Sequence, residues 1–224
     1  HRESHVNRRT LPALTALATA TTLLLTACGG ESPEADEKIP GAGESSAEAS
    51  ASPGEKADAI DRPEMKFPKD FKMTWDVATP SDPDEAAAVN DARNYMEATF
   101  HAVTEQDPED SAYKFYVVPL SQAQQYAKET AEAIVERGWT VTGELRHSNV
   151  QVRKGESKKL ITVSFCQNES EAFSKEVKTG KVLKDQGSEK PYYAYTVLME
   201  KSASIDGLWQ AKAASATKGA AQCA

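Results

Sequence analysis

Apolar residues along the chain change from helical to alternate spacing at Gly138. Before that point one set shares a helix face: Val89, Ala92, Tyr95, Met96, Phe100 and Val103. A capping group at 81–83 is expected to start this helix, which should end near Thr104. A short helical turn is expected over 109–116. A third helix is expected over 121–137, where Gly138 ends it.

After Gly138 the apolar residues alternate, which predicts strands. Apolar side chains in 139–145 lie on one side of the first strand, whereas Val150 and Val152 lie on the other. A change of side requires one extra residue in the strand. We therefore expect a β-bulge or sharp bend near 147–149.

Later strands are expected over 160–166 and 192–199, and neither segment contains an acidic residue. A small hairpin over 173–183 lies between them, and a turn at 206–207 leads into a strand over 208–214. Because helices come first and strands follow, the pattern predicts an α+β fold. The N-terminal helices should pack on a bent antiparallel sheet.

The chain divides into three parts of different composition. Residues 1–27 combine basic and apolar segments, as a signal peptide does. Residues 28–64 are rich in Gly, Ser, Pro and Glu, and such a polar, acidic segment is expected to be a disordered tether. Residues 65–224 are long enough for one compact domain. The aromatic segment 67–75 should lead into this domain and pack on it.

The first part ends in the sequence Leu25-Thr26-Ala27-Cys28. These four residues resemble the lipobox of bacterial lipoproteins. The resemblance implies that the Cys28 thiol carries diacylglycerol and that Cys28 becomes the N-terminus. Two alternatives are a plain secretory signal and an N-terminal membrane helix. The apolar run is short for a membrane span and contains Pro12. We therefore expect a lipid-anchored protein on the extracytoplasmic face of the cell membrane.

The formal charge of −8 limits the possible binding partners, and the count of three cysteines limits the possible disulfides. Nucleic-acid binding needs a basic surface, which the acidic composition does not supply, so no nucleic-acid partner is expected. With Cys28 taken by the lipid, Cys166 and Cys223 remain. Outside the cytoplasm two such cysteines are expected to form a disulfide; the alternative is two free buried thiols.

The order of elements resembles the cone-shaped nuclear-transport-factor-two-like, or ketosteroid-isomerase-like, domains. Several phrases over 67–223 also resemble a group of uncharacterised actinobacterial secreted lipoproteins. These phrases are Phe67-Pro68-Lys69-Asp70, Asp91-Ala92-Arg93-Asn94-Tyr95, Glu105-Gln106-Asp107-Pro108, Val177-Lys178-Thr179-Gly180-Lys181 and Gly219-Ala220-Ala221-Gln222-Cys223. The resemblance implies a bent sheet around an interior space, but it implies no particular activity, because this fold carries several.

Few residues of the domain are candidates for chemistry. His101 and His147 have no neighbours at metal-ligand spacing, so neither a metal nor another cofactor is predicted. His147 lies at the expected bend, where it would face the mouth of the cone. Cone isomerases use a buried acid and a tyrosine hydroxyl. Tyr113, Tyr193 and Tyr195 are candidates for the hydroxyl. The expected strands offer no acid, so no catalytic residue is predicted.

Two functions are consistent with this sequence. The preferred one is a tethered binding or interaction domain, whose partner is an envelope protein or a small ligand. The alternative is an isomerase- or dehydratase-like enzyme that uses the cone interior. An open apolar interior with an acid or a histidine beside a tyrosine hydroxyl favours the enzyme, whereas an interior filled by side chains excludes it.

Overall fold

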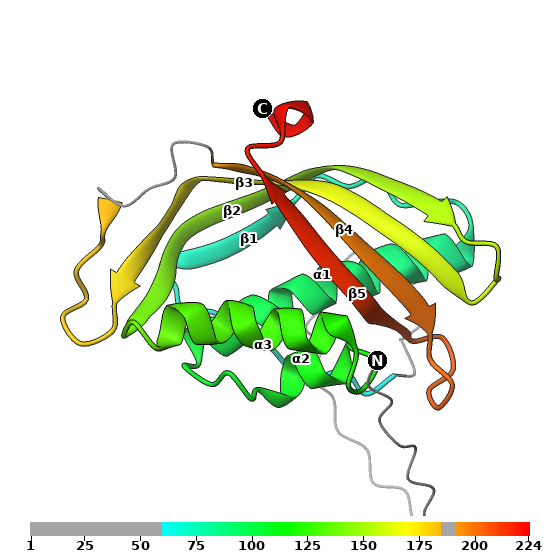
Figure 1. The fold of residues 1–224 in the computed structure, drawn as a ribbon, viewed down its shortest axis with the longest axis horizontal. Coiled ribbons are helices and arrows are strands. Elements are labelled where there is room, and N and C mark those ends of the chain that lie inside the picture. The colour runs from blue at the N-terminus through cyan, green and yellow to red at the C-terminus, as the bar shows by residue number, and fades with distance from the viewer. Residues whose placement is uncertain (1–59, 185–190) are drawn as a thin grey trace, which may run out of the picture. The chain divides into compact units, whose positions relative to one another are not determined.

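The computed structural model describes residues 60–184 and 191–224 (Figure 1). The expected signal peptide, Cys28 and most of the expected tether therefore lie outside the described residues. Among the residues described, no helix has the length and hydropathy needed to cross a membrane.

A five-stranded sheet forms one layer of the domain, in the order β1-β2-β3-β4-β5. Its strands are β1 (Phe71–Trp75), β2 (Trp139–Lys154), β3 (Leu160–Glu176), β4 (Tyr192–Lys201) and β5 (Trp209–Lys218). The pairs from β2 to β5 are antiparallel, but β1 pairs with β2 in parallel. The prediction of an antiparallel sheet is therefore wrong at this edge. The helices between β1 and β2 form the crossover that parallel neighbours require.

Three helices follow β1: α1 (Pro83–Thr104), α2 (Ser111–Phe115) and α3 (Gln122–Val135). The Asp82 side chain caps α1 by accepting a hydrogen bond from the Glu85 amide, and Ser121 caps α3 in the same way. Pro83 stands in the first turn of α1, where a missing N–H costs nothing. These local signals explain why the bounds expected for α1 match those in the structure.

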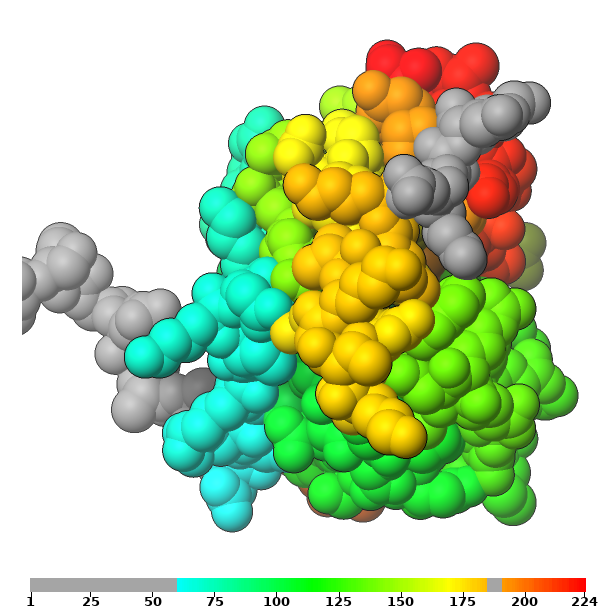
Figure 2. Space-filling model, turned by 90° about the vertical axis from the view of Figure 1, so that its left-hand side faces the viewer, coloured from blue at the N-terminus to red at the C-terminus, as the bar shows by residue number. Residues whose placement is uncertain are grey.

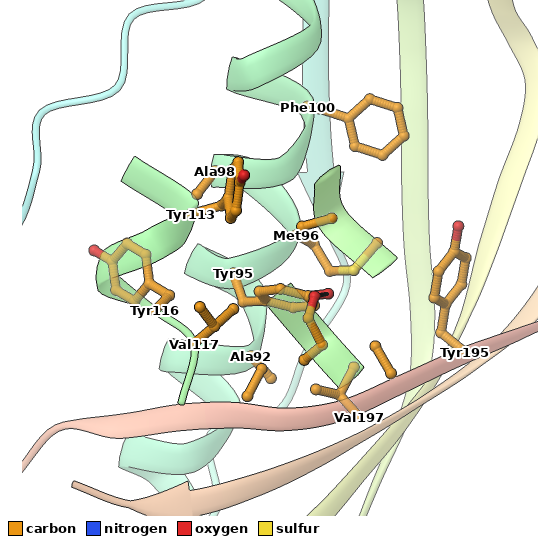
Figure 3. Packing of buried hydrophobic residues seen from close by; sticks show 14 of the residues in the cluster. Ala92, Tyr95, Met96, Ala98, Phe100, Tyr113, Tyr116, Val117, Tyr195 and Val197 are labelled. Atoms are coloured by element: carbon orange, nitrogen blue, oxygen red, sulfur yellow. Dashed lines mark hydrogen bonds between the residues drawn. The ribbon is translucent and has the colours of Figure 1, made fainter. Parts of the chain in front are cut away.

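The sheet curves over α1 and α3, and the core lies between the two layers (Figure 1). Tyr95 and Met96 project from α1 toward β4, where Val197 and Tyr195 face them (Figure 3). The inner face of α3 consists of small, fully buried residues: Ala123, Ala127 and Ala131. Because these side chains are short, the Tyr95 hydroxyl reaches the Ala123 carbonyl of α3 at 2.9 Å.

The long strand β2 bends at two irregularities. The pairing with β3 shifts register between Ser148 and Gln151, and Asn149 takes a φ of 54° there. This confirms the bulge expected near 147–149. A second shift, opposite Glu144 and Arg146, was not foreseen, and there the extra residue lies in β3 between Asn168 and Glu171. Both shifts lie where the strand must curve around the helices.

Strand β3 is longer than expected. The segment expected over 160–166 and the first arm of the expected hairpin form one continuous strand, Leu160–Glu176. A bridge between Lys175 and Val182 closes the hairpin. Figure 2 shows this end of β3 in gold, between the cyan N-terminal segment and the green helical layer. The residues between Cys166 and Phe173 are therefore strand residues, and the extra residue between Asn168 and Glu171 changes which of the later ones face into the domain.

The two ends of the described chain are held to the domain by specific contacts. A disulfide joins Cys166 of β3 to Cys223, with their Cα atoms 5.4 Å apart, which confirms the expected pair. Near the other end, Ile60 packs against the core and Arg62 forms an ion pair with the buried Asp91. Ile60 and Arg62 belong to the segment that the sequence analysis assigned to the tether.

Candidate ligand-binding cavity

A cavity of about 270 Å³ lies between the helices and the inner face of the sheet. Its walls come from α1, α3, β2, β3 and β4. Aromatic and aliphatic side chains form much of the lining: Phe100, Ile134, Val141, Leu145, Phe173 and the rings of Tyr193 and Tyr195. Thr130, Thr140 and Ser174 add hydroxyl groups to the lining. The volume lies just below the usual range for ligand sites, so a compact molecule with both apolar and polar parts fits it best.

Glu169 is the acidic residue in this lining. Inward-facing residues alternate along β3, so Glu169 follows Phe165 and Gln167 on the inner face. Burial raises the pKa of the Glu169 carboxyl, whereas the Gln167 amide and the positive charge of Lys218 oppose the rise. The Gln167 side-chain amide lies 2.7 Å from Glu169 Oε1. Over residues 60–184 and 191–224, Glu169 forms no ion pair. The cavity therefore holds a carboxyl group that is readily protonated.

Gln167 connects Glu169 to His147. His147 and Gln167 are direct partners across β2 and β3, and His147 Nε2 lies 2.9 Å from Gln167 Oε1. On the other side of the ring, Nδ1 lies 3.1 Å from the Thr74 carbonyl of β1. A hydrogen-bonded row thus runs from β1 across β2 to the carboxyl group on β3.

His147 is fixed by aromatic packing as well as by these contacts. Its side chain is 1% exposed, and its ring stacks on Trp75 with centroids 3.8 Å apart. Phe165 meets the imidazole edge to face, with centroids 5.8 Å apart. Burial lowers the pKa of His147 to about 4, so the imidazole is neutral at physiological pH. His147 does not line this cavity but lines a separate pocket together with Trp75, Ser148 and Cys223.

Tyr195 is the tyrosine most firmly held at the cavity. Its ring stacks on Phe165 at 5.3 Å, and Tyr126 of α3 meets it edge to face. Burial raises the pKa of the Tyr195 hydroxyl, and also that of Tyr126. Both groups therefore stay protonated and can donate hydrogen bonds.

The other residues considered from the sequence lie elsewhere. The Tyr113 hydroxyl donates to the Pro108 carbonyl at 2.7 Å, away from the cavity. His101 Nδ1 lies 2.7 Å from Asp110 Oδ2 and helps to join α1 to α2. Within the described part of the chain, no group of three or more His, Cys, Asp or Glu residues is arranged to hold a metal ion.

Sequence reasoning missed Glu169, because it ended the strand at Cys166. The polar neighbours Asn168 and Ser170 interrupt the apolar pattern of the strand. The alternation of Phe165, Gln167 and Glu169 was the signal that places the carboxyl group on the inner face.

Comparisons with known proteins give a limited result. No protein-family profile matches the sequence, and no curated protein matches it. Solved structures with a similar fold include a ketosteroid isomerase-like protein from Erwinia carotovora atroseptica. It is 18% identical with a TM-score of 0.40, and the match covers 60% of this chain and 95% of the other. A protein from Catenulispora acidiphila matches at 12% identity and a TM-score of 0.40, with coverages of 59% and 92%. At this level of similarity, nothing about the cavity is inferred from these proteins.

Proposed function

We propose that this protein is a lipid-anchored domain on the extracytoplasmic face of the cell membrane that binds a small, uncharged molecule. The observation that carries the binding proposal is Glu169, a carboxyl group with a raised pKa in the wall of a cavity that also presents aromatic rings and hydroxyl groups. Burying an acid without an ion-pair partner is costly, so its placement there favours a binding role.

The anchoring part of this proposal rests on the sequence Leu25-Thr26-Ala27-Cys28. A diacylglycerol chain on Cys28 would hold the domain at the membrane through the hydrophobic effect. Replacement of Cys28 by Ala should move the protein from the membrane fraction to the soluble extracellular fraction. Replacement of Ser45 by Ala, further along the same segment, is the matched control. Membrane retention of the Cys28→Ala protein would contradict lipid anchoring.

The ligand proposed for the cavity is uncharged, with an apolar body and one hydrogen-bonding group. Phe100, Phe173 and the tyrosine rings contact the body, while Glu169 contacts the polar group. Burial of a ring against such walls contributes about 25 cal/mol per Å² of apolar area.

Cyclohexanone is a suitable probe, because it combines a compact apolar ring with one carbonyl group. Binding to the full chain is measured by NMR shifts of side chains in the cavity wall, such as Thr130 and Ile134. Ala172→Leu fills part of the cavity and should remove these shifts. Thr196→Leu adds similar bulk to an exposed position on β4 and should preserve them. If both variants bind cyclohexanone equally well, the probe binds outside the cavity.

A second candidate function is proton transfer at a carbon atom beside a carbonyl group. It is favoured by the presence of Glu169, Tyr193 and Tyr195 in one lining. A carboxyl group with a raised pKa suits acid–base catalysis, and a tyrosine hydroxyl can stabilise the oxyanion. Exchange of the α-protons of cyclohexanone for deuterium, lost on Glu169→Gln, would support this activity. Binding without exchange above the rate in buffer would exclude it for this probe.

A further inference from the structure

We propose that His147, Gln167 and Glu169 act as one unit, in which the orientation of the Gln167 amide ties the proton on Glu169 to the protonation of His147. Gln167 is thereby a positioning residue for the cavity acid. This inference concerns the protein without ligand, so it stands or falls independently of the proposed function.

The argument starts from the hydrogen-bonding capacity of the three side chains. His147 Nδ1 faces the Thr74 carbonyl, which only accepts, so Nδ1 must carry a proton. Gln167 has one accepting end and one donating end. These ends contact His147 Nε2 at 2.9 Å and Glu169 Oε1 at 2.7 Å. The amide can therefore satisfy both neighbours only when one offers a proton and the other offers a lone pair.

Two arrangements satisfy every contact. In the first, His147 is an imidazolium whose Nε2–H donates to the Gln167 carbonyl, and the Gln167 NH₂ group donates to the Glu169 carboxylate. The structure shows the amide in the first orientation, with its carbonyl toward His147 and its NH₂ group toward Glu169. In the second arrangement, the amide is turned by half a rotation, which exchanges two groups of nearly equal size. The Gln167 NH₂ group then donates to Nε2 of a neutral His147, and the Glu169 carboxylic acid donates to the Gln167 carbonyl. Both arrangements hold the same number of protons, so they differ by one proton moved from His147 to Glu169 through exchange with solvent.

The surroundings favour the second arrangement. It places no formal charge in a layer where His147 is fully buried and Glu169 partly buried. Arg93 of α1 opposes a positive charge on His147, and Lys218 of β5 favours a negative charge on Glu169. The aromatic groups facing the pair are Trp75 and Phe165 beside His147 and, around Glu169, Tyr126, Tyr193 and Tyr195. The tyrosine hydroxyls stay protonated in this range, since burial raises the pKa of both Tyr126 and Tyr195.

An ionised Glu169 beside a neutral His147 satisfies neither orientation of the amide. One orientation sets the Gln167 carbonyl against the lone pair of Nε2, and the other sets it against the carboxylate. The neutral His147 therefore keeps the proton on Glu169. In this way a histidine outside the cavity makes the cavity carboxyl group a hydrogen-bond donor.

The test is a double-substitution cycle read through the pKa of Glu169 in the full chain. The carboxyl ¹³C signal of Glu169 is assigned from its loss in Glu169→Gln. His147→Phe keeps a flat ring against Trp75 and releases the amide, which can then donate permanently to the carboxylate. We expect the pKa of Glu169 to fall by about one unit, the contribution of one hydrogen bond. In a Gln167→Met background, which lacks the amide, His147→Phe should leave the pKa of Glu169 unchanged.

If His147→Phe lowers the pKa of Glu169 equally with Gln167 and with Gln167→Met, the effect comes from packing or acts through space, and the proposal is overturned. The proposal is also overturned if the pKa of Glu169 falls in neither background. A measurement on the unsubstituted chain covers the case in which His147→Phe does not fold. At neutral pH the ¹⁵N shifts of His147 should show a protonated Nδ1 and an unprotonated Nε2 that accepts a hydrogen bond. A neutral ring protonated at Nε2 would overturn the proposal.

Discussion

Reduction of the Cys166–Cys223 disulfide should weaken the domain by an amount that the loop length sets. The two cysteines are 57 residues apart in sequence, and the bond restricts that loop in the unfolded chain. For a loop of 57 residues the chain-entropy relation gives about 4 kcal/mol of unfolding free energy. With a urea dependence of about 2 kcal/mol per molar, the unfolding midpoint should fall by about 2 M.

The assay is urea unfolding of the full chain, followed by tryptophan fluorescence, with and without a thiol reductant. The control is the variant with both Cys166→Ser and Cys223→Ser, whose midpoint should match that of the reduced protein and should not respond to the reductant. An oxidised protein whose midpoint stays constant on reduction would refute the reasoning. If the unfolding midpoint of the double variant still falls on reduction, the effect comes from a thiol other than Cys166 and Cys223.

Three further predictions concern single side chains. Gly143→Ala should destabilise the fold by more than 3 kcal/mol in urea unfolding, because the new Cβ would lie 2.0 Å from the Glu171 carbonyl oxygen at a φ of +90°; a loss under 1 kcal/mol would contradict that geometry. His147 should titrate by NMR with a pKa of about 4 when folded and near 6.5 when unfolded. Between these two pKa values the unfolded chain binds more protons than the folded chain, so the His147 contribution to the free energy of unfolding should rise with pH and be complete above this window. If the unfolding free energy of the wild type changes with pH as steeply as that of His147→Phe, this contribution is ruled out. Asp91→Ala should cost about 3 kcal/mol, because it leaves the buried amide of Trp209 without its acceptor at 2.8 Å, whereas Asp61→Ala nearby should cost little. Equal losses for both aspartates would argue against a special role for Asp91.

Elements with local signals were predictable from the sequence. The bounds of α1 follow from Asp82, Pro83 and the apolar face, all of which lie within the helix or at its end. The bulge near Asn149 follows from the change of side of the valines, which is also a local pattern. The disulfide could be predicted because only two cysteines remain after Cys28 is assigned to a lipid.

Non-local pairing explains what the sequence did not reveal. The five residues of β1 are too few to show alternation, and their partners in Gly143–His147 lie some seventy residues further along the chain. The second half of β3 contains Gln167, Glu169 and Ala172. Because these side chains are polar or small, the alternation typical of a strand is hidden in the sequence. These residues lie in a strand because β2 and β4 pair with it, and that pairing is visible only in three dimensions.

The Arg62–Asp91 ion pair determines how a mechanical pull on the N-terminal segment would enter the fold. One oxygen of Asp91 binds Arg62, and the other accepts the hydrogen bond from the Trp209 amide at the start of β5. Tension applied to the chain at Ile60 would therefore reach α1 and the start of β5, at one edge of the sheet, before it reached β1 at the other edge. A single carboxylate thus ties the N-terminal segment to the last strand of the chain.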